Sequence, residues 1–446
     1  MRKFSVLLAL LAFMALSATG QQRKIKFIKY TLPNGLKVIL HQDNTVPVVA
    51  VTVLYHVGSK NEKPGQSGFA HFFEHLMFEG SQNIGRGDFM KYVSNAGGQL
   101  NANTSQDRTF YYENLPSNQL KLGLWLESER MMHAKIEPVG VNTQREVVKE
   151  EKRMRIDNQP YGSIFEEVCK NLFGGTPYAW TPIGTMEDLN KAKLSDFITF
   201  YKTYYVPNNA VLSIAGDINI DSTKKLIAAY FGPIPGAKNA VPRPDIHLQP
   251  LGAAADRIDT VFDNIQLPAV IEAYRGPVQG TPDYYAFRVL SNVLSSGSSS
   301  RMQKSLVDQK QLALGIGSFP MSQEGVGAYL NYGIVNSGVS PDQLQQAMDE
   351  EITGIKTTLV GGHEFQKVMN QIETAYVGRA STQLGIAESL ANYEVYFGNA
   401  DLINTELERF KKVTPEDVQK VANKYLYNDN RIILYYLPKS TEDKKG

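Results

Sequence analysis

The sequence predicts an α+β protein of two related domains, each an α/β sandwich in which helices pack on an antiparallel-rich sheet. Helical and strand-like patterns alternate along most of the chain. A helix, an asparagine-rich turn and a strand follow one another around Asn208 and again around Asn428, an offset of 220 residues. A proline-rich stretch, 236–252, separates the two copies. We therefore expect a first domain at 25–235, a linker at 236–252 and a second domain at 253–440.

The elements of the first copy follow from local patterns. A strand, an Asn-Gly turn and a second strand are expected across 30–40, and a β-rich run at 48–57 precedes a polar loop. Helices are expected at 88–96, 120–136, 141–156 and 193–205, and strands at 109–112 and 210–215. In the second copy, a helix at 413–425 and a strand at 431–437 repeat the last two of these elements.

The N-terminus has the pattern of a secretory signal. Arg2 and Lys3 precede an apolar run at 4–16, and small residues at 17–20 provide a cleavage site. We predict a signal peptide at 1–20. Its apolar run is too short to span a bilayer comfortably, so we expect export without a stable membrane anchor, into a bacterial periplasm.

Composition excludes several classes of partner. The chain carries 46 basic and 45 acidic residues, a net charge of +1, so no global field favours nucleic acid or an anionic membrane. The hydrophobic fraction of 42% is that of a globular protein. The single cysteine, Cys169, cannot form an intramolecular disulfide, and its apolar helical surroundings favour a buried structural thiol.

The residues that carry chemistry begin with His71-Phe72-Phe73-Glu74-His75. In a helix His71 and His75 stand one turn apart on one face, so both imidazoles can reach one metal ion. Two imidazoles and a carboxylate suit zinc, and a carboxylate beside a zinc-bound water can take its proton. A zinc enzyme needs a third protein ligand, and the candidates are the adjacent carboxylates Glu150 and Glu151 in the predicted helix at 141–156.

This motif resembles that of the pitrilysin/insulinase family of inverted-motif zinc metallopeptidases, and most closely its short members related to mitochondrial processing peptidase. The resemblance extends from about residue 28 to residue 438. Further matching segments lie at 32–36, 57–59, 98–102, 182–185, 205–209 and 216–217. The resemblance implies that the chain folds as one half of a clam-shell peptidase.

The resemblance also implies roles for particular residues. His71, His75 and Glu151 would hold one Zn²⁺ per chain, because the family's spacing selects Glu151 over Glu150. Glu74 would take the proton of the zinc-bound water. Asn101 and Ala102 would lie on an edge strand that pairs with the substrate backbone, although an edge strand without a ligand is the simpler structural interpretation.

Two features depart from the family pattern. Gln144 stands where many members have a glutamate that supports the site from behind the ligands. Val307 and Leu314 stand where active members have an arginine and a tyrosine that bind substrate and stabilise the oxyanion, and neither side chain can donate a hydrogen bond. Arg301, close by, is better interpreted as a structural residue at a helix start. We therefore expect a dimer in which a homologous subunit supplies the arginine and the tyrosine, a heterodimer rather than a homodimer.

Two functions from different classes are compatible with these residues. The first is a zinc-dependent endopeptidase subunit that hydrolyses peptides or unfolded segments. The second is a non-catalytic scaffold or binding subunit of the same fold. The intact set of His71, Glu74, His75 and Glu151 favours the enzyme, and a structural zinc site is disfavoured because no cysteine or further histidine lies nearby in sequence.

Overall fold

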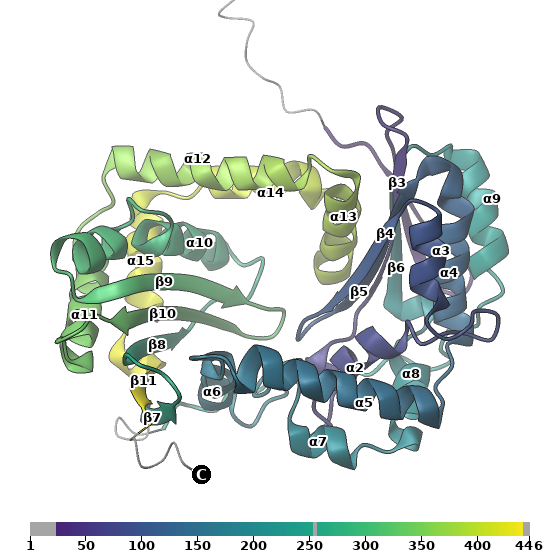
Figure 1. Cartoon of the computed structure of the whole chain (residues 1–446). Coiled ribbons are helices and arrows are strands. Elements are labelled where there is room, and N and C mark those ends of the chain that lie inside the picture. Colours follow the sequence, from purple (N-terminus) through teal and green to yellow (C-terminus); the bar gives the residue numbers. More distant parts are fainter. Residues whose placement is uncertain (1–23, 253–256, 440–446) are drawn as a thin grey trace, which may run out of the picture.

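Two mixed β-sheets form the framework of the protein (Figure 1). The structure is a computed structural model and describes residues 24–252 and 257–439, so the predicted signal peptide lies outside the described residues. The first sheet has the strand order β1-β2-β6-β3-β5-β4 and the second the order β7-β11-β8-β10-β9. The strands of the first sheet are β1 (Ile28–Thr31), β2 (Lys37–Gln42), β3 (Val48–Tyr55), β4 (Gln99–Thr104), β5 (Thr109–Pro116) and β6 (Ala210–Gly216). Those of the second are β7 (Ile258–Asp263), β8 (Ala269–Arg275), β9 (Ala313–Ser322), β10 (Gly327–Val335) and β11 (Arg431–Pro438).

The second sheet repeats the pairing of the first. In each sheet one parallel pair, β2 with β6 or β7 with β11, adjoins a run of antiparallel pairs. That run is β6-β3-β5-β4 in the first sheet and β11-β8-β10-β9 in the second. Only β1 has no counterpart in the second sheet, among the strands of the described residues. The predicted α+β class is confirmed.

Helices accompany both sheets, with α2 to α9 following strands of the first half and α10 to α15 following strands of the second. In the first half they are α2 (Phe69–Leu76), α3 (Asp88–Asn95), α4 (Leu120–His133), α5 (Pro138–Lys152), α6 (Ile164–Phe173), α7 (Met186–Lys191), α8 (Leu194–Tyr204) and α9 (Ile220–Phe231). In the second half they are α10 (Pro282–Ser295), α11 (Pro341–Thr357), α12 (Gly362–Arg379), α13 (Gln383–Phe397), α14 (Leu402–Lys411) and α15 (Pro415–Tyr425). The helix predicted at 141–156 begins earlier because Pro138 occupies its first turn, and after Lys152 it continues as a π-helix, η3 (Arg153–Asp157).

The asparagine-rich turn recurs in the structure, but the offset between its two copies is one residue larger than predicted. Asn209 Nδ2 donates to the carbonyl oxygen of Tyr204 at 2.8 Å, at the end of α8. Asn430 Nδ2 donates to the carbonyl oxygen of Tyr425 at 2.8 Å, at the end of α15. The equivalent residues are therefore Asn209 and Asn430, an offset of 221 rather than 220. The sequence pattern aligns the first asparagine of each turn, whereas the hydrogen bonds define the equivalence.

Each half of the chain provides a helix that covers the sheet of the other half (Figure 1). Helix α6 packs on β8 and β11, where Val168, Cys169 and Leu172 join the core of the second sheet. Helix α13 packs on β3 and β6, where Ala387 and Leu390 are buried against the first sheet. Burial raises the pKa of the Cys169 thiol to about 12, which agrees with the predicted buried thiol. The domain boundaries at 25–235 and 253–440 remain a prediction. The hydrophobic core of each predicted domain includes one helix from the other, α13 in the first and α6 in the second.

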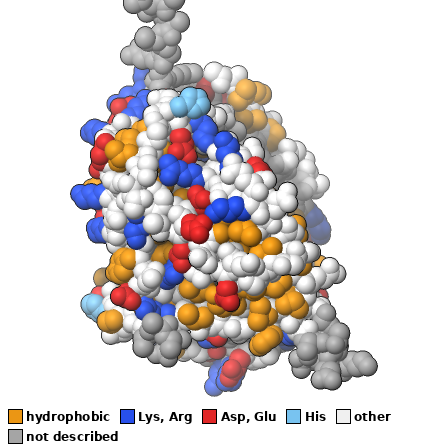
Figure 2. All heavy atoms as spheres, turned by 90° about the vertical axis from the view of Figure 1, so that its left-hand side faces the viewer, with side chains coloured by type: hydrophobic (Ala, Val, Ile, Leu, Met, Phe, Trp, Pro, Cys, Tyr) orange, Lys and Arg blue, Asp and Glu red, His pale blue; other side chains and the backbone are white. Residues whose placement is uncertain are grey.

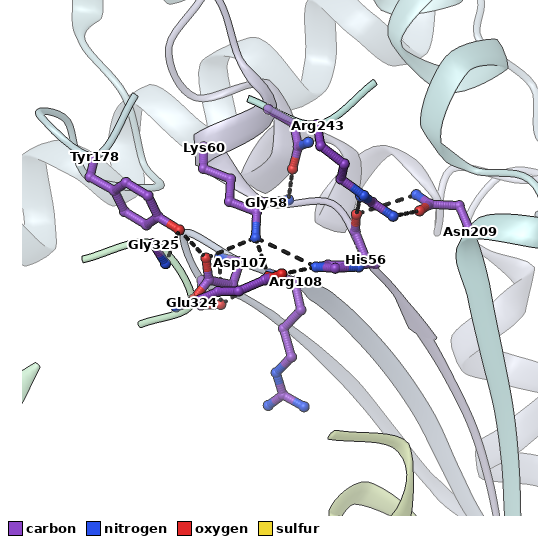
Figure 3. A network of polar contacts seen from close by, with 12 residues as sticks. His56, Gly58, Lys60, Asp107, Arg108, Tyr178, Asn209, Arg243, Glu324 and Gly325 are labelled. Carbon is purple, nitrogen blue, oxygen red and sulfur yellow. Dashed lines mark hydrogen bonds and ion pairs between the residues drawn. The ribbon is translucent and has the colours of Figure 1, made fainter. Parts of the chain in front are cut away.

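A polar network fastens the β9–β10 turn of the second half to loops of the first (Figure 3). Glu324 Oε2 accepts from Lys60 Nζ at 2.5 Å and lies 2.7 Å from His56 Nε2. The N–H of Glu324 donates to Asp107 Oδ2 at 2.9 Å, and Tyr178 donates its hydroxyl to Asp107 Oδ1 at 2.6 Å. Burial alone would raise the pKa of Glu324, but the hydrogen bond with His56 and the charge of Lys60 lower it to about 2. The carboxylate is therefore ionised at neutral pH, and it ties the two halves together.

The outer face of the second half carries charges of both signs. Figure 2 shows Lys and Arg side chains beside Asp and Glu side chains, with hydrophobic side chains gathered in the lower part of the face. The outer strand β7 exposes Ile258 and Phe262. Among the described residues, every helix is too short or too polar to cross a membrane.

Candidate metal centre

Helix α2, which carries the His-x-x-Glu-His motif, has one apolar face and one face with the histidines and Glu74. Phe69, Phe72 and Phe73 are buried, and they stack against α8, for example with a 4.5 Å separation of the ring centroids of Phe72 and Phe197. This apolar face fixes the rotation of the helix. The opposite side, which carries the histidines and Glu74, is thereby directed toward the space between α5 and β4, both of which contact α2.

A buried carboxylate fixes the start of α2. Glu62 Oε2 accepts from the N–H of Gly68 at 2.9 Å, and Glu62 Oε1 accepts from the N–H of Ala70 at 2.8 Å. Trp180 Nε1 donates to the same carboxylate at 2.9 Å. These bonds satisfy N–H groups that the helix itself leaves open, and they hold the backbone next to His71.

The packing of α5 on α2 brings a carboxylate to the two imidazoles. Glu151 Oε2 lies 3.2 Å from His75 Nε2 and 3.6 Å from His71 Nε2. One ligand atom from each of the three residues lies within 4.8 Å of the others. The neighbouring Glu150 is exposed and pairs with Arg153 at 2.9 Å, so the cluster contains Glu151 rather than Glu150.

The electrostatics of the cluster differ from residue to residue. Burial, then the charge of His75, lowers the pKa of His71 to about 4, so its imidazole is neutral at neutral pH. The hydrogen bond from His75 is the main cause that lowers the pKa of Glu151. Burial raises the pKa of Glu74 above its usual range. The site thus combines a neutral imidazole and an ionised carboxylate with a second carboxyl group of raised basicity.

Comparison with known proteins identifies the family. Residues 37–185 match the profile described as "Insulinase (Peptidase family M16)", and residues 191–372 match "Peptidase M16 inactive domain". The zinc protease PqqE of Helicobacter pylori is 30% identical over 96% of this chain and 97% of its own length. The chain belongs to the insulinase family of peptidases. The resemblance to this family, inferred from sequence motifs, is confirmed.

Two further matches each cover about nine-tenths of the chain. A probable mitochondrial-processing peptidase subunit beta of Arabidopsis thaliana is 23% identical over 89% of this chain and 76% of its own length. The crystal structure of a protease from Helicobacter pylori superposes with a TM-score of 0.87 at 29% identity, covering 93% of this chain and 100% of that protein. The family assignment therefore applies to both sheets.

The residues predicted to bind substrate lie on β4, the outer strand of the first sheet. Ala102 is buried, whereas Asn101 is exposed. Asn101 Oδ1 accepts from the N–H of Ala102 at 2.9 Å, so the asparagine side chain occupies a backbone donor of this strand. A peptide that adds to β4 through this N–H would displace the Asn101 amide.

Gln144 lies two turns before Glu151 on α5. Its Nε2 donates to Glu79 Oε1 at 2.5 Å, and Glu79 also pairs with Arg86. Gln144 Oε1 is buried and has no hydrogen-bond partner among the described residues. Its direct contact is thus with Glu79, and support of the metal ligands by Gln144 remains a prediction.

The side chains of Val307 and Leu314, at the positions where the resemblance predicts an arginine and a tyrosine in active members, offer no hydrogen-bond donor. Val307 packs in the π-helix η6 (Gln303–Gln309) against the second core, and Leu314 on β9 is exposed. Arg301 Nη2 pairs with Glu364 Oε2 at 2.8 Å, a contact that fits a structural residue.

Sequence reasoning missed two residues of the site, Glu62 and Arg155. Arg155 Nη1 lies 2.7 Å from Glu151 Oε1 and forms an ion pair with it. The i,i+4 spacing from Glu151 to Arg155 was an available signal, because residues at this spacing are neighbours on a helix. Glu62 carried no comparable signal, since its partners belong to a helix start and to a distant loop.

Proposed function

We propose that this chain is a zinc-dependent endopeptidase subunit that hydrolyses peptides or unfolded segments. The observation that carries the proposal is the convergence of His71, His75 and Glu151 on α2 and α5, with Glu74 between the histidines in sequence. Relatives named zinc proteases support it.

The donor set fits zinc in a site with an open position. Two imidazole nitrogens and one carboxylate oxygen are a common catalytic ligand set, with the fourth position left to water or substrate. Among the described residues the cluster consists of these three ligands, and no further histidine, cysteine or acidic residue belongs to it. His71, His75 and Glu151 would hold one Zn²⁺ per chain, and a structural site closed by protein ligands is disfavoured.

The remaining chemistry belongs to the side chains and backbone around the cluster. A zinc ion bound there would lower the pKa of a water molecule and polarise the carbonyl of the scissile bond. Glu74 accepts the proton of the attacking water and returns it to the leaving amine, a role that its raised pKa favours. The backbone of β4 holds the substrate as an added strand, with Asn101 and Ala102 at the contact.

Full activity requires a partner subunit in this proposal. The positions of Val307 and Leu314 supply no donor to an oxyanion, so a homologous chain would contribute the arginine and tyrosine across a dimer interface. The relative named a mitochondrial-processing peptidase subunit supports a multi-subunit arrangement. The signal-like segment at 1–20 supports export to a bacterial periplasm.

The test combines metal analysis with peptide cleavage. The wild type and Glu74→Gln are purified and assayed for bound zinc and for cleavage of a quenched peptide, alone and with a homologous partner, with and without chelator. We expect one zinc per chain in both proteins and cleavage by the wild type with its partner only. Zinc without cleavage in any pairing would instead support the non-catalytic scaffold, and a wild type that binds no zinc would contradict the proposal.

A further inference from the structure

The two oxygens of the Glu151 carboxylate have different partners. Oε2 faces His75 Nε2 at 3.2 Å and His71 Nε2 at 3.6 Å. Oε1 forms an ion pair with Arg155, whose Nη1 lies 2.7 Å away. A carboxylate that is free on both sides can rotate and can offer either one oxygen or both to a metal, whereas here one oxygen is already engaged.

We propose that Arg155 is a positioning residue of the metal centre, holding Glu151 so that a single oxygen is presented to the ion. This inference rests on the proposed zinc site. It assigns to Arg155 neither contact with the substrate nor a role in folding. Hydrogen-bonded partners behind metal ligands commonly fix the orientation of those ligands and raise metal affinity.

The local backbone is built to place Arg155 behind Glu151. The π-helix η3 follows α5 directly, and Arg155 stands four residues after Glu151, a spacing at which helical side chains are neighbours. The segment is anchored by the buried Lys152, whose Nζ lies 3.1 Å from Asp157 Oδ1 and 2.6 Å from Glu166 Oε1. The position of the Arg155 backbone is thus determined by contacts that do not involve its own side chain.

Because the Arg155 side chain is largely exposed, its effect on metal binding can be measured apart from any effect on folding stability. Its side chain is 75% exposed, and an exposed i,i+4 ion pair contributes little to folding. The ion pair nevertheless places a positive charge 2.7 Å from Glu151 Oε1, and this attraction opposes rotation of the carboxylate. Removal of Arg155 should therefore change metal affinity without changing the stability of the metal-free protein.

The charge of Arg155 also has an effect in the opposite direction. The positive charge of Arg155 would repel a bound cation, and this repulsion would make the metal bind more weakly in the wild type than in a variant without the charge. Because the guanidinium is largely exposed, solvent and salt screen this repulsion. We expect the orienting effect to be the larger one.

The chain offers a matched control. Arg153 lies in the same π-helix and its Nη1 pairs with Glu150 Oε2 at 2.9 Å, an exposed ion pair of the same chemistry that does not involve the cluster. Arg153→Ala therefore removes an equal charge and a similar pair, but leaves Glu151 held. A nonspecific effect of removing an ion pair from this segment should appear in both variants, whereas loss of the nearer Arg155 charge should by itself tighten zinc binding.

The experiment measures the zinc dissociation constant of the full chain by competition with a chromogenic chelator. We expect Arg155→Ala to weaken zinc binding by about tenfold, Arg155→Lys to lie between it and the wild type, and Arg153→Ala to match the wild type. The thermal midpoint of all metal-free proteins should be the same.

Equal zinc affinity in Arg155→Ala and Arg153→Ala would overturn the inference, as would tighter binding in Arg155→Ala. A metal-free Arg155→Ala with a clearly lowered thermal midpoint would also overturn it, because the residue would then act through folding. Failure of the wild type itself to bind zinc would contradict the proposed function, so the two failures are distinguishable.

Discussion

The two halves of the chain share a strand order but differ in the segment that comes after the central strand. After β3, the first half inserts a loop held by Glu62 and then α2 with two histidines and Glu74. After β8, the second half proceeds to α10, whose only acidic residue is Asp283 and which contains neither histidine nor cysteine. The fold therefore provides the same scaffold twice, and the candidate chemistry depends on the side chains that α2 and α5 carry.

Both halves also bury an arginine that pairs with two carboxylates, although Asp349 in the second half is only partly buried. Arg130 on α4 is fully buried and pairs with Glu127 and Glu113. Arg431 on β11 pairs with Glu272 and Asp349. Buried ion pairs are costly to break, and this similarity shows that burial of charge is common to both halves whereas a metal-ligand cluster is found, among the described residues, in the first half alone.

The largest expected effect is the loss of peptide cleavage when the carboxyl group of Glu74 on α2 is replaced, and Asp283 on the corresponding helix α10 provides the control. Glu74→Gln should lower the rate of peptide cleavage by roughly 10²- to 10⁴-fold, because the general base is lost. Zinc content should be unchanged. Asp283→Asn on α10 should leave the cleavage rate within error, since Asp283 pairs with Lys424 and Tyr425, which both belong to the second half. Equal loss of activity in both variants would contradict the assignment of the chemistry to the first half.

The exchanged helices should couple the stability of the two halves. Leu172 on α6 and Leu390 on α13 are both fully buried, each against the sheet of the other half. Leu172→Ala and Leu390→Ala should each destabilise the protein by about 2–5 kcal/mol. The midpoints of urea unfolding measured by circular dichroism and by tyrosine fluorescence should coincide, and both should shift by the same amount in each variant. Two transitions, of which each variant shifts only one, would mean that the halves unfold independently.

The network at Glu324 should make part of this coupling sensitive to acid. Because the pKa of Glu324 is lowered to about 2, below its value in the unfolded chain, its ionised form stabilises the folded state above the unfolded pKa. This stabilisation is lost as pH falls through the folded pKa. Glu324→Gln should therefore lower the thermal midpoint at pH 7, and the difference from the wild type should shrink as pH falls from about 4.5 toward 2. A difference that does not depend on pH would show that the charge of Glu324 is not what joins the halves.

The smallest expected effect is a change in the rate at which a thiol reagent labels Cys169 in α6. Burial raises the pKa of its thiol to about 12, so a thiol-specific chromogenic reagent should label the native protein very slowly and label it fully in denaturant. The native labelling rate then reports how often α6 leaves the second sheet. Leu172→Ala should increase that rate more than Leu390→Ala does, and the reverse order would contradict the packing of α6.

Much of the fold could be predicted because local patterns recur with a clear period. The helix expected at 120–136 from the spacing of its apolar residues is α4, although it ends at His133. The strand expected at 109–112 is longer, extending to Pro116, because its remaining residues pair with β3. Element boundaries depend on partners in the fold, and a single sequence does not display them.

The exchange of α6 and α13 was not predictable from the same patterns. An apolar stripe such as Val168, Cys169 and Leu172 indicates that a helix is buried on one face, but burial of apolar surface has no direction and does not specify which sheet covers it. The π-helix η3 was missed for a related reason, since its residues continue the pattern of α5.

The candidate metal ligands could be predicted from the sequence, because the spacing from His71 to His75 is one helical turn and the motif has few other uses. How these side chains meet depends on the packing of two helices. The packing of α5 on α2 brings Glu151 to both histidines and leaves Glu150 exposed, in agreement with the choice of Glu151 that the family resemblance implies. Spacing within a helix is fixed by backbone geometry, whereas contacts between helices depend on side-chain packing across the whole core.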